Sequence, residues 1–237
     1  MIDDAPGLTA AGKAIRAPRA AAAAGVAFAL LLGTSIVLVR IAIPDDQQSA
    51  GGWVEDDSKR SLVVFAFNLL PFAGIAFLWF IGVVRDRLGE GEDRFFATVF
   101  LGSGLLFIAM LFVSGAVISS LVVSAHEARG SQSAEVWSFG RRAGLTLFTV
   151  YAMRMAAVFT ISTVSLFMRL GIVPPWLALL GFATAAVLLL GSGQLRWVEV
   201  AFPIWILVLS THLLITMMRG AKESTQATEP GRPQRAD

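Results

Sequence analysis

The chain has 237 residues, of which 56% are hydrophobic and only 15% are charged. A water-soluble domain carries about 25% charged residues, so this chain lacks the polar surface that a soluble globule needs. Cysteine is absent, which excludes disulfides, thiolate metal sites and cysteine nucleophiles. The net charge of +2 is small, and the arginines flank apolar runs, so we expect no nucleic-acid partner.

Residues 1–19 form a short polar tail, and the apolar run at 20–43 predicts a first membrane span. About 20 helical residues cross the hydrocarbon core, and lipid offers the backbone no hydrogen bonds, so each such run is expected to be a helix. A basic start also resembles a signal peptide, but this run exceeds the usual apolar length of about 7–15 residues. We therefore expect an uncleaved anchor.

Small residues recur every four positions along this first span, at Ala21, Gly25, Ala29 and Gly33. Such a stripe lets another helix approach closely. Packing inside the bundle is the favoured use of the stripe, and dimerisation is the alternative.

The loop at 44–60 is rich in aspartate and glutamate, but it lacks the spacing of an EF-hand calcium site. We therefore expect a solvated acidic loop. A second span at 61–84 contains Asn68 and Pro71, and a charged turn follows at 85–94. The proline frees a backbone carbonyl one turn earlier, which neighbours or water must satisfy.

Four further spans are predicted along the rest of the chain, at 95–124, 144–169, 176–190 and 197–218. A polar loop at 125–139 follows the third span, and tight turns at 170–176 and 191–196 flank the short fifth one. Residues 219–237 form a polar tail, which we expect to be disordered. The predicted fold is thus all-α, a polytopic bundle of six membrane-spanning helices over residues 20–218.

Six spans place both termini on one side of the membrane. Eleven of the 19 basic residues lie on the terminal side and seven on the other. The positive-inside rule therefore predicts cytoplasmic termini. The preference for arginine over lysine hints at a bacterial genome, so we expect a bacterial inner-membrane protein.

Arg154 lies near the middle of the fourth span, about 15 Å below its start at 1.5 Å per residue. A charge at that depth costs about 2.5–3.5 kcal/mol on the insertion scale, so such residues usually face protein or a wet cavity. No carboxylate belongs to the middle of any span. One hypothesis is that Arg154 binds an anion, namely a lipid headgroup, a phosphate or a carboxylate. The favoured alternative is a structural arginine satisfied by Asn68, backbone carbonyls and internal water.

A candidate anion or lipid site is built around Arg154 from side chains on its helical face and at its depth. Its members are Arg154, Asn68, Tyr151, Ser162 and Ser165. A second stripe of threonines lies on a different face of the same helix.

The two histidines, His126 and His212, lie at depths about 20 Å apart, which excludes a haem held by both. We expect His212 to make a polar contact between helices. Ser103 lies between two glycines and gives a conceivable hydrolase pair with His212, but position 101 is Leu where rhomboid proteases have a further glycine. Serines flanked by glycine in membrane helices are mostly packing devices. No catalytic residue, metal site or cofactor is predicted.

The leading functional prediction is a non-enzymatic membrane protein. It would be a subunit or accessory of a larger assembly, or a binder of anionic lipid or solute near Arg154. Its expected partners are the lipid bilayer, other membrane proteins or a second copy of the chain. The alternatives are a small secondary transporter lined by Arg154, Asn68 and Tyr151, and an intramembrane serine hydrolase using Ser103 and His212.

Overall fold

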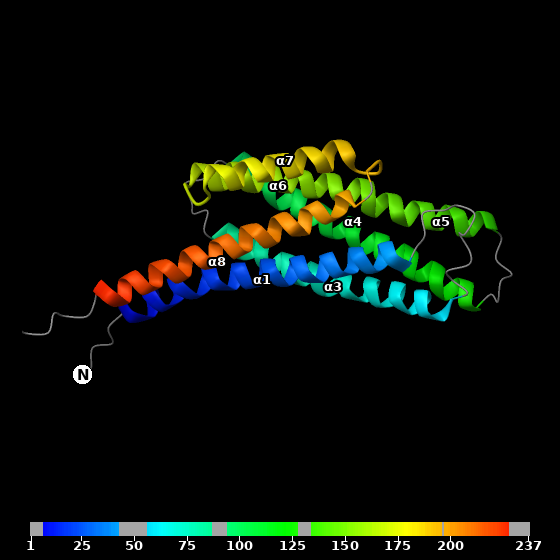
Figure 1. Cartoon of the computed structure of the whole chain (residues 1–237), viewed down its shortest axis with the longest axis horizontal. Coiled ribbons are helices and arrows are strands. Elements are labelled where there is room, and N and C mark those ends of the chain that lie inside the picture. Colours follow the sequence, from blue (N-terminus) through cyan, green and yellow to red (C-terminus); the bar gives the residue numbers. More distant parts are fainter. Residues whose placement is uncertain (1–6, 43–55, 87–93, 128–133, 196, 228–237) are drawn as a thin grey trace, which may run out of the picture.

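The computed structural model describes residues 7–42, 56–86, 94–127, 134–195 and 197–227. All elements in these ranges are helical: α1 (Gly7–Ala42), α3 (Asp57–Asp86), α4 (Arg94–Glu127), α5 (Ala134–Thr146), the π-helix η2 (Leu147–Ala152), α6 (Met153–Arg169), α7 (Pro175–Gly191), the 3₁₀-helix η3 (Val198–Val200) and α8 (Ala201–Ala227). The helices run roughly along one long axis, and α1 begins at the end of the bundle where α8 ends (Figure 1). The all-α prediction is confirmed.

Within the described ranges, five helical stretches are long and apolar enough to cross a membrane, which indicates a multi-pass membrane protein. They are Ala22–Ala42, Asp57–Arg85, Phe95–Ser124, Val136–Arg169 and Val198–Thr216. The fourth stretch joins α5, η2 and α6 into one continuous rod. The predicted fifth span corresponds to α7, a shorter apolar helix of 17 residues.

Several helices extend beyond the spans that hydrophobicity predicts. The polar region before the first span is helical from Gly7, and α8 continues to Ala227 through residues expected in a disordered tail. The polar loop predicted at 125–139 gives way to helix from Ala134. Helix α3 begins at Asp57 because the Asp56 carboxylate accepts hydrogen bonds from two backbone N–H groups of its first turn, at 3.0 and 3.3 Å.

Much of the predicted loop structure lies outside the described residues. This applies to the acidic segment 43–55, to residues 87–93 of the charged turn and to 128–133. The first six and last ten residues lie outside them as well.

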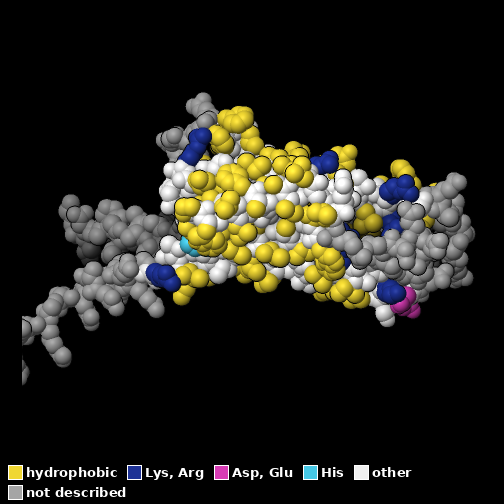
Figure 2. Space-filling model, turned by 45° about the horizontal axis from the view of Figure 1, so that its top comes forward, with side chains coloured by type: hydrophobic (Ala, Val, Ile, Leu, Met, Phe, Trp, Pro, Cys, Tyr) yellow, Lys and Arg dark blue, Asp and Glu magenta, His cyan; other side chains and the backbone are white. Residues whose placement is uncertain are grey.

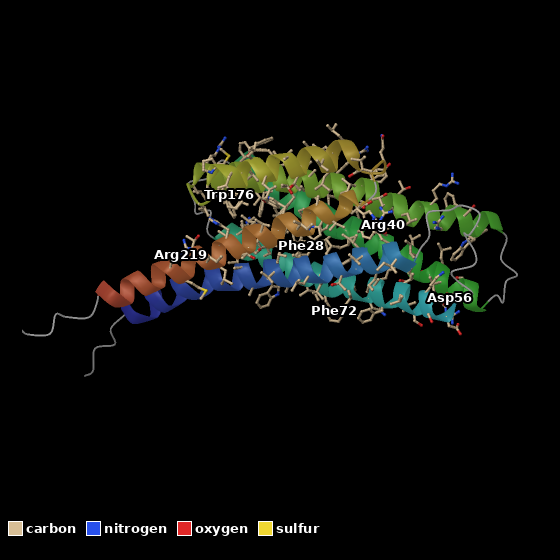
Figure 3. All side chains as sticks on the ribbon, in the orientation of Figure 1. Phe28, Arg40, Asp56, Phe72, Trp176 and Arg219 are labelled. Atoms are coloured by element: carbon tan, nitrogen blue, oxygen red, sulfur yellow. The ribbon has the colours of Figure 1, made fainter. Side chains whose placement is uncertain are left out.

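Phenylalanine rings fill the centre of the bundle. Phe77 on α3 lies 4.5 Å from Phe28 on α1 and 4.9 Å from Phe159 on α6, measured between ring centroids. Further rings from α3, α4 and α8 complete the cluster: Phe80, Phe100, Phe107 and Phe202. Figure 3 shows Phe28 in the middle of the bundle. Because tilted and edge-on rings pack favourably, this cluster holds five helices to a common centre.

On the face that Figure 2 shows, yellow apolar side chains cover much of the bundle's length, and the dark blue basic side chains lie mostly towards the two ends. Large side chains are exposed there, including Phe72 at 62%, Trp79 at 65% and Leu179 at 71%. An apolar surface of this extent is what a lipid-facing protein requires.

Two glycines of the small-residue stripe on α1, Gly25 and Gly33, face α8. A Cβ atom added at Gly25 would lie 2.0 Å from Ser210 Oγ and 3.0 Å from a ring carbon of Phe80. Gly33 approaches Pro203 at 4.0 Å by the same measure. The predicted close helix approach is therefore confirmed at Gly25, between α1 and α8.

We expect the substitution Gly25→Leu to destabilise the protein by about 1–3 kcal/mol, because overpacking forces neighbours out of their rotamers. Gly82 is the matched control, since a Cβ there meets nothing within 4 Å. Unfolding of the purified protein in a denaturing detergent measures both variants. Equal midpoints for Gly25→Leu and Gly82→Leu would contradict the close contact.

Candidate functional site

Arg154 lies on the outer surface of the bundle, where its side chain is exposed. It belongs to the continuous rod Val136–Arg169, about 27 Å from one end and about 22 Å from the other at 1.5 Å per residue. Among the residues that the structure describes, Arg154 has no hydrogen-bond or ion-pair partner. A charge midway along an apolar span thus points away from its own protein.

Of the residues predicted to form a site with Arg154, Tyr151 and Ser165 lie on the same helical face as Arg154, and Ser162 does not. Tyr151, one turn earlier on η2, is 54% exposed, and Ser165 is half-buried. Ser162 is buried, and its hydroxyl donates to the Val158 carbonyl at 2.9 Å. Eight residues at 100° each turn Ser162 about 80° away from Arg154, towards the interior.

The threonines of the second stripe are buried in the same rod. Thr160 donates to the Ala156 carbonyl at 2.8 Å and Thr163 to the Phe159 carbonyl at 2.7 Å. Hydroxyls that bond one turn back on their own helix are satisfied without a partner helix. The threonine stripe is therefore part of the packed interior.

Asn68 is exposed on α3, and no hydrogen bond joins it to Arg154 within the described ranges. His212 on α8 is half-buried, and its ring lies edge-on to Trp176 of α7, with 6.1 Å between the centroids. The predicted helix contact of His212 is thus an aromatic one in the structure. The binding roles of the residues grouped with Arg154 stay predictions.

Ser103 is buried on α4, where its hydroxyl donates to the Val99 carbonyl at 2.6 Å. The same hydroxyl also lies 3.2 Å from the Phe100 carbonyl. The described residues show no hydrogen bond from Ser103 to His212, so the hydrolase pair is not assembled in this geometry.

An ion pair between Arg40 and Glu199 was not predicted from the sequence. Arg40 Nη2 donates to Glu199 Oε1 at 2.6 Å, joining the end of α1 to η3 at the start of α8. The Glu199 side chain is 1% exposed and that of Arg40 is 23% exposed. Figure 3 shows Arg40 towards the end of the bundle that carries Asp56, away from Arg219 and Trp176. A buried carboxylate of this kind depends on its partner for stability.

Trp197 turns the chain just before Glu199. Its φ of 66° lies in the left-handed region, and no other described non-glycine residue has a positive φ. A bulky residue in that region stores about 1–3 kcal/mol of strain, which the surrounding structure must offset. The turn brings Glu199 inward to meet Arg40.

A small cavity of about 40 Å³ lies beside this ion pair. Its polar walls come from Arg40, Arg141 on α5 and Thr149 on η2, and its remaining walls are apolar. Thr149 donates its own proton to the Leu145 carbonyl at 2.9 Å. The π-helix η2 therefore passes directly along the cavity, and π-helical turns are frequent at functional sites.

The candidate charged features are thus the surface cation Arg154 and the buried Arg40–Glu199 ion pair, with the cavity that Arg40 and Arg141 line beside it. Within the described ranges no group of three or more His, Cys, Asp or Glu side chains could hold a metal ion. Comparison with known protein families, curated proteins and solved structures finds no match to this chain.

Proposed function

We propose that the protein is a non-enzymatic subunit of a membrane assembly and that the Arg154 surface docks on a membrane helix of another protein. The observation that carries the proposal is the exposed guanidinium of Arg154, midway along a 34-residue span. The docking surface consists of Arg154 and Tyr151, with the shallow groove beside Tyr151. The side chains of Phe139, Arg142, Thr146 and Leu147 line this groove.

The charge of Arg154 favours a partner that carries a carboxylate. A lipid-facing charge near the middle of a bilayer costs at least about 2.5–3.5 kcal/mol. An Asp or Glu on an apposed helix removes that cost by pairing with the guanidinium away from water. Docking is then favourable because it neutralises Arg154.

A second copy of this chain supplies no such carboxylate. The acidic residues of the sequence lie in the tails, the loops and the ends of the helices, and Glu199 is already paired with Arg40. Two copies meeting through this face would bring like charges together. Anionic lipid fits less well, because its phosphate lies about 15 Å from the midplane of a 30 Å core.

The proposal includes six membrane crossings, with α7 as the fifth. Helix α7 starts after the turn that ends α6 and runs back to the end of the bundle where α8 begins (Figure 1). Its 17 residues are about 25 Å long, the short end of the range for a crossing. Six crossings put both termini on one side. The excess of basic residues there supports cytoplasmic termini in a bacterial inner membrane.

No described feature favours the transporter or the hydrolase over a subunit. Arg154, Tyr151 and Asn68 are exposed on the outer surface, and the centre between the helices is filled by phenylalanine rings. Both alternatives stay predictions from the sequence.

Variants that keep or remove the charge of Arg154 test the proposed docking. The protein is extracted from its native membrane in mild detergent, and native mass spectrometry measures which proteins stay bound at fixed stoichiometry. We expect a partner with a carboxylate in a membrane helix. Arg154→Lys should retain this partner, and Arg154→Leu should lose it by about tenfold or more, since a charge-assisted bond is broken.

Asn68→Leu is the matched control, because Asn68 is also polar, exposed and near the middle of a span. It should leave the partner bound. Replacing the partner's carboxylate by Arg should restore binding to Arg154→Glu. A chain that is extracted without a protein partner, or one that binds equally well in all variants, would refute docking through Arg154.

A further inference from the structure

The inward face of the rod formed by α5, η2 and α6 stays against α4 over its whole described length. A Cβ atom added at Gly140 or at Gly144 would lie 2.7 or 2.5 Å from a side chain of α4. Three buried residues continue this face at intervals of four: Phe148, Ala152 and Ala156. Over the same residues a plain α-helix would turn this face away by about 160°, at about 100° per residue. The π-helix η2 prevents this, because hydrogen bonds that span five residues take up about one extra residue in the turn.

The same extra residue aligns two arginines on the outward face of the rod. Arg142 and Arg154 are 12 residues apart in the sequence, which on a plain α-helix would place them about 120° apart around the axis. One extra residue in η2 removes about 100° of this angle and leaves about 20°. Both side chains are exposed, and Tyr151 between them is 54% exposed. The rod therefore presents two guanidinium groups on one outward stripe.

Arg142 is available to a partner in the same way as Arg154. Among the residues that the structure describes, it has no hydrogen-bond or ion-pair partner, and it lines the shallow groove beside Tyr151. It lies about 17 Å along the axis from Arg154 at 1.5 Å per α-helical residue. Half of the hydrocarbon core is about 15 Å thick. With Arg154 midway along its span, Arg142 lies near the edge of the core.

We infer that the partner helix carries two carboxylates about 11 residues apart, one for Arg154 and one for Arg142. This inference rests on the proposed docking at Arg154. Eleven residues make about three turns of a straight α-helix, so side chains at that spacing share a face and lie about 17 Å apart. An Asp or Glu at each position meets a guanidinium, and such pairs form charge-assisted hydrogen bonds.

The two ion pairs have different roles because they lie at different depths. The pair at Arg154 is shielded from water and supplies most of the affinity. The pair at Arg142 is partly hydrated, and it fixes how far along the rod, and with which face, the partner helix binds. A helix with Lys or Arg at the level of Arg142 is rejected by repulsion between like charges.

Synthetic membrane helices of about 25 residues test this spacing on the purified full-length protein. Each is built from leucine and alanine and carries one Glu at its centre. The first has no other acidic residue, the second has another Glu 11 residues away, and the third has it nine residues away, about 180° around the helix. The second and third helices have the same composition. Acceptor-labelled helices are titrated against the donor-labelled protein in lipid vesicles, and energy transfer measures binding.

We expect the helix with the 11-residue spacing to bind about fivefold more tightly than the helix with one Glu, the upper end of the range for a partly hydrated ion pair. The nine-residue spacing should give no such gain. Arg142→Gln should reduce the affinity for the 11-residue spacing to that for a single Glu. Arg219→Gln is the matched control and should keep the gain, because Arg219 is exposed on α8 at the end of the bundle away from α5 (Figures 1 and 3).

The two proposals fail in different ways. Equal affinity for the two spacings, or a gain that survives Arg142→Gln, would overturn the partner with two carboxylates and leave docking at Arg154 standing. If the helix with one Glu bound Arg154→Leu as tightly as the unaltered protein, docking at Arg154 would be refuted, and this inference with it.

Discussion

Replacing Glu199 by Ala is expected to destabilise the protein by about 3–5 kcal/mol, the largest effect of any single change considered. Removing one partner of a buried ion pair leaves the other charge uncompensated, and that penalty exceeds the value of the pair itself. Here Arg40, whose side chain is 23% exposed, would lose its ion pair with the buried carboxylate. Unfolding of the purified protein in a denaturing detergent, monitored by tryptophan fluorescence, measures the loss.

Two further variants distinguish the effect of breaking the buried ion pair from the effect of removing any charged side chain. The double variant Glu199→Leu with Arg40→Met should recover most of the stability, since apolar residues often replace a buried pair at little cost. Asp57→Ala breaks the exposed ion pair with Arg60 on α3 and should cost less than about 1 kcal/mol. If Glu199→Ala were as mild as Asp57→Ala, the buried pair would not hold α1 to α8.

The second large effect is expected at the centre of the aromatic cluster. Phe77 is fully buried and contacts rings from four other helices. Phe77→Ala should cost about 2–3 kcal/mol. This is less than the loss of about 3–5 kcal/mol in water-soluble cores. In lipid, burying an apolar ring gains little transfer free energy, so the cost of the cavity left by the ring is the main contribution.

Phe72 gives a matched control on the same helix. It is 62% exposed and points away from the bundle in Figure 3. Phe72→Ala should change the unfolding midpoint little, because lipid fills the space that the ring leaves. Similar losses for the two variants would show that the rings do not form a common packing centre.

Hydrophobicity identified the helices well and their ends poorly. An apolar run of about 20 residues is a strong signal because lipid leaves the backbone no alternative to a helix. Outside lipid that constraint is gone, and local features decide where a helix ends. The cap at Asp56 moved the start of α3, and α8 continues to Ala227 through a segment in which Ala221, Lys222 and Glu223 are good helix formers.

The polar sites show why depth was easier to predict than orientation. The position of Arg154 near mid-span followed from counting residues, but its outward direction depends on which face of the rod packs inside. Ser162 is only eight residues away on the same helix, yet it is buried. Hydrophobicity gives no such information for a helix that is apolar on most sides.

The Arg40–Glu199 pair was within reach of the sequence and was missed. Arg40 lies just before the end of the first span, and Glu199 lies just after the start of the sixth. In a six-span chain these ends lie on the same side of the membrane, so opposite charges at equal depth were a usable signal. The contribution of Arg141 was missed as well: helix was expected only from residue 144, whereas α5 begins at Ala134.

The lipid exposure of the Arg154 surface in the native membrane tests docking most directly. The chain has no cysteine of its own, so Tyr151→Cys and Phe72→Cys each accept a single spin label. Docking predicts that oxygen reaches the label at position 151 less than the label at 72 in native membranes, and that the difference disappears when the purified chain is placed in nanodiscs. Equal oxygen accessibility at both positions in the native membrane would show that no helix covers Arg154.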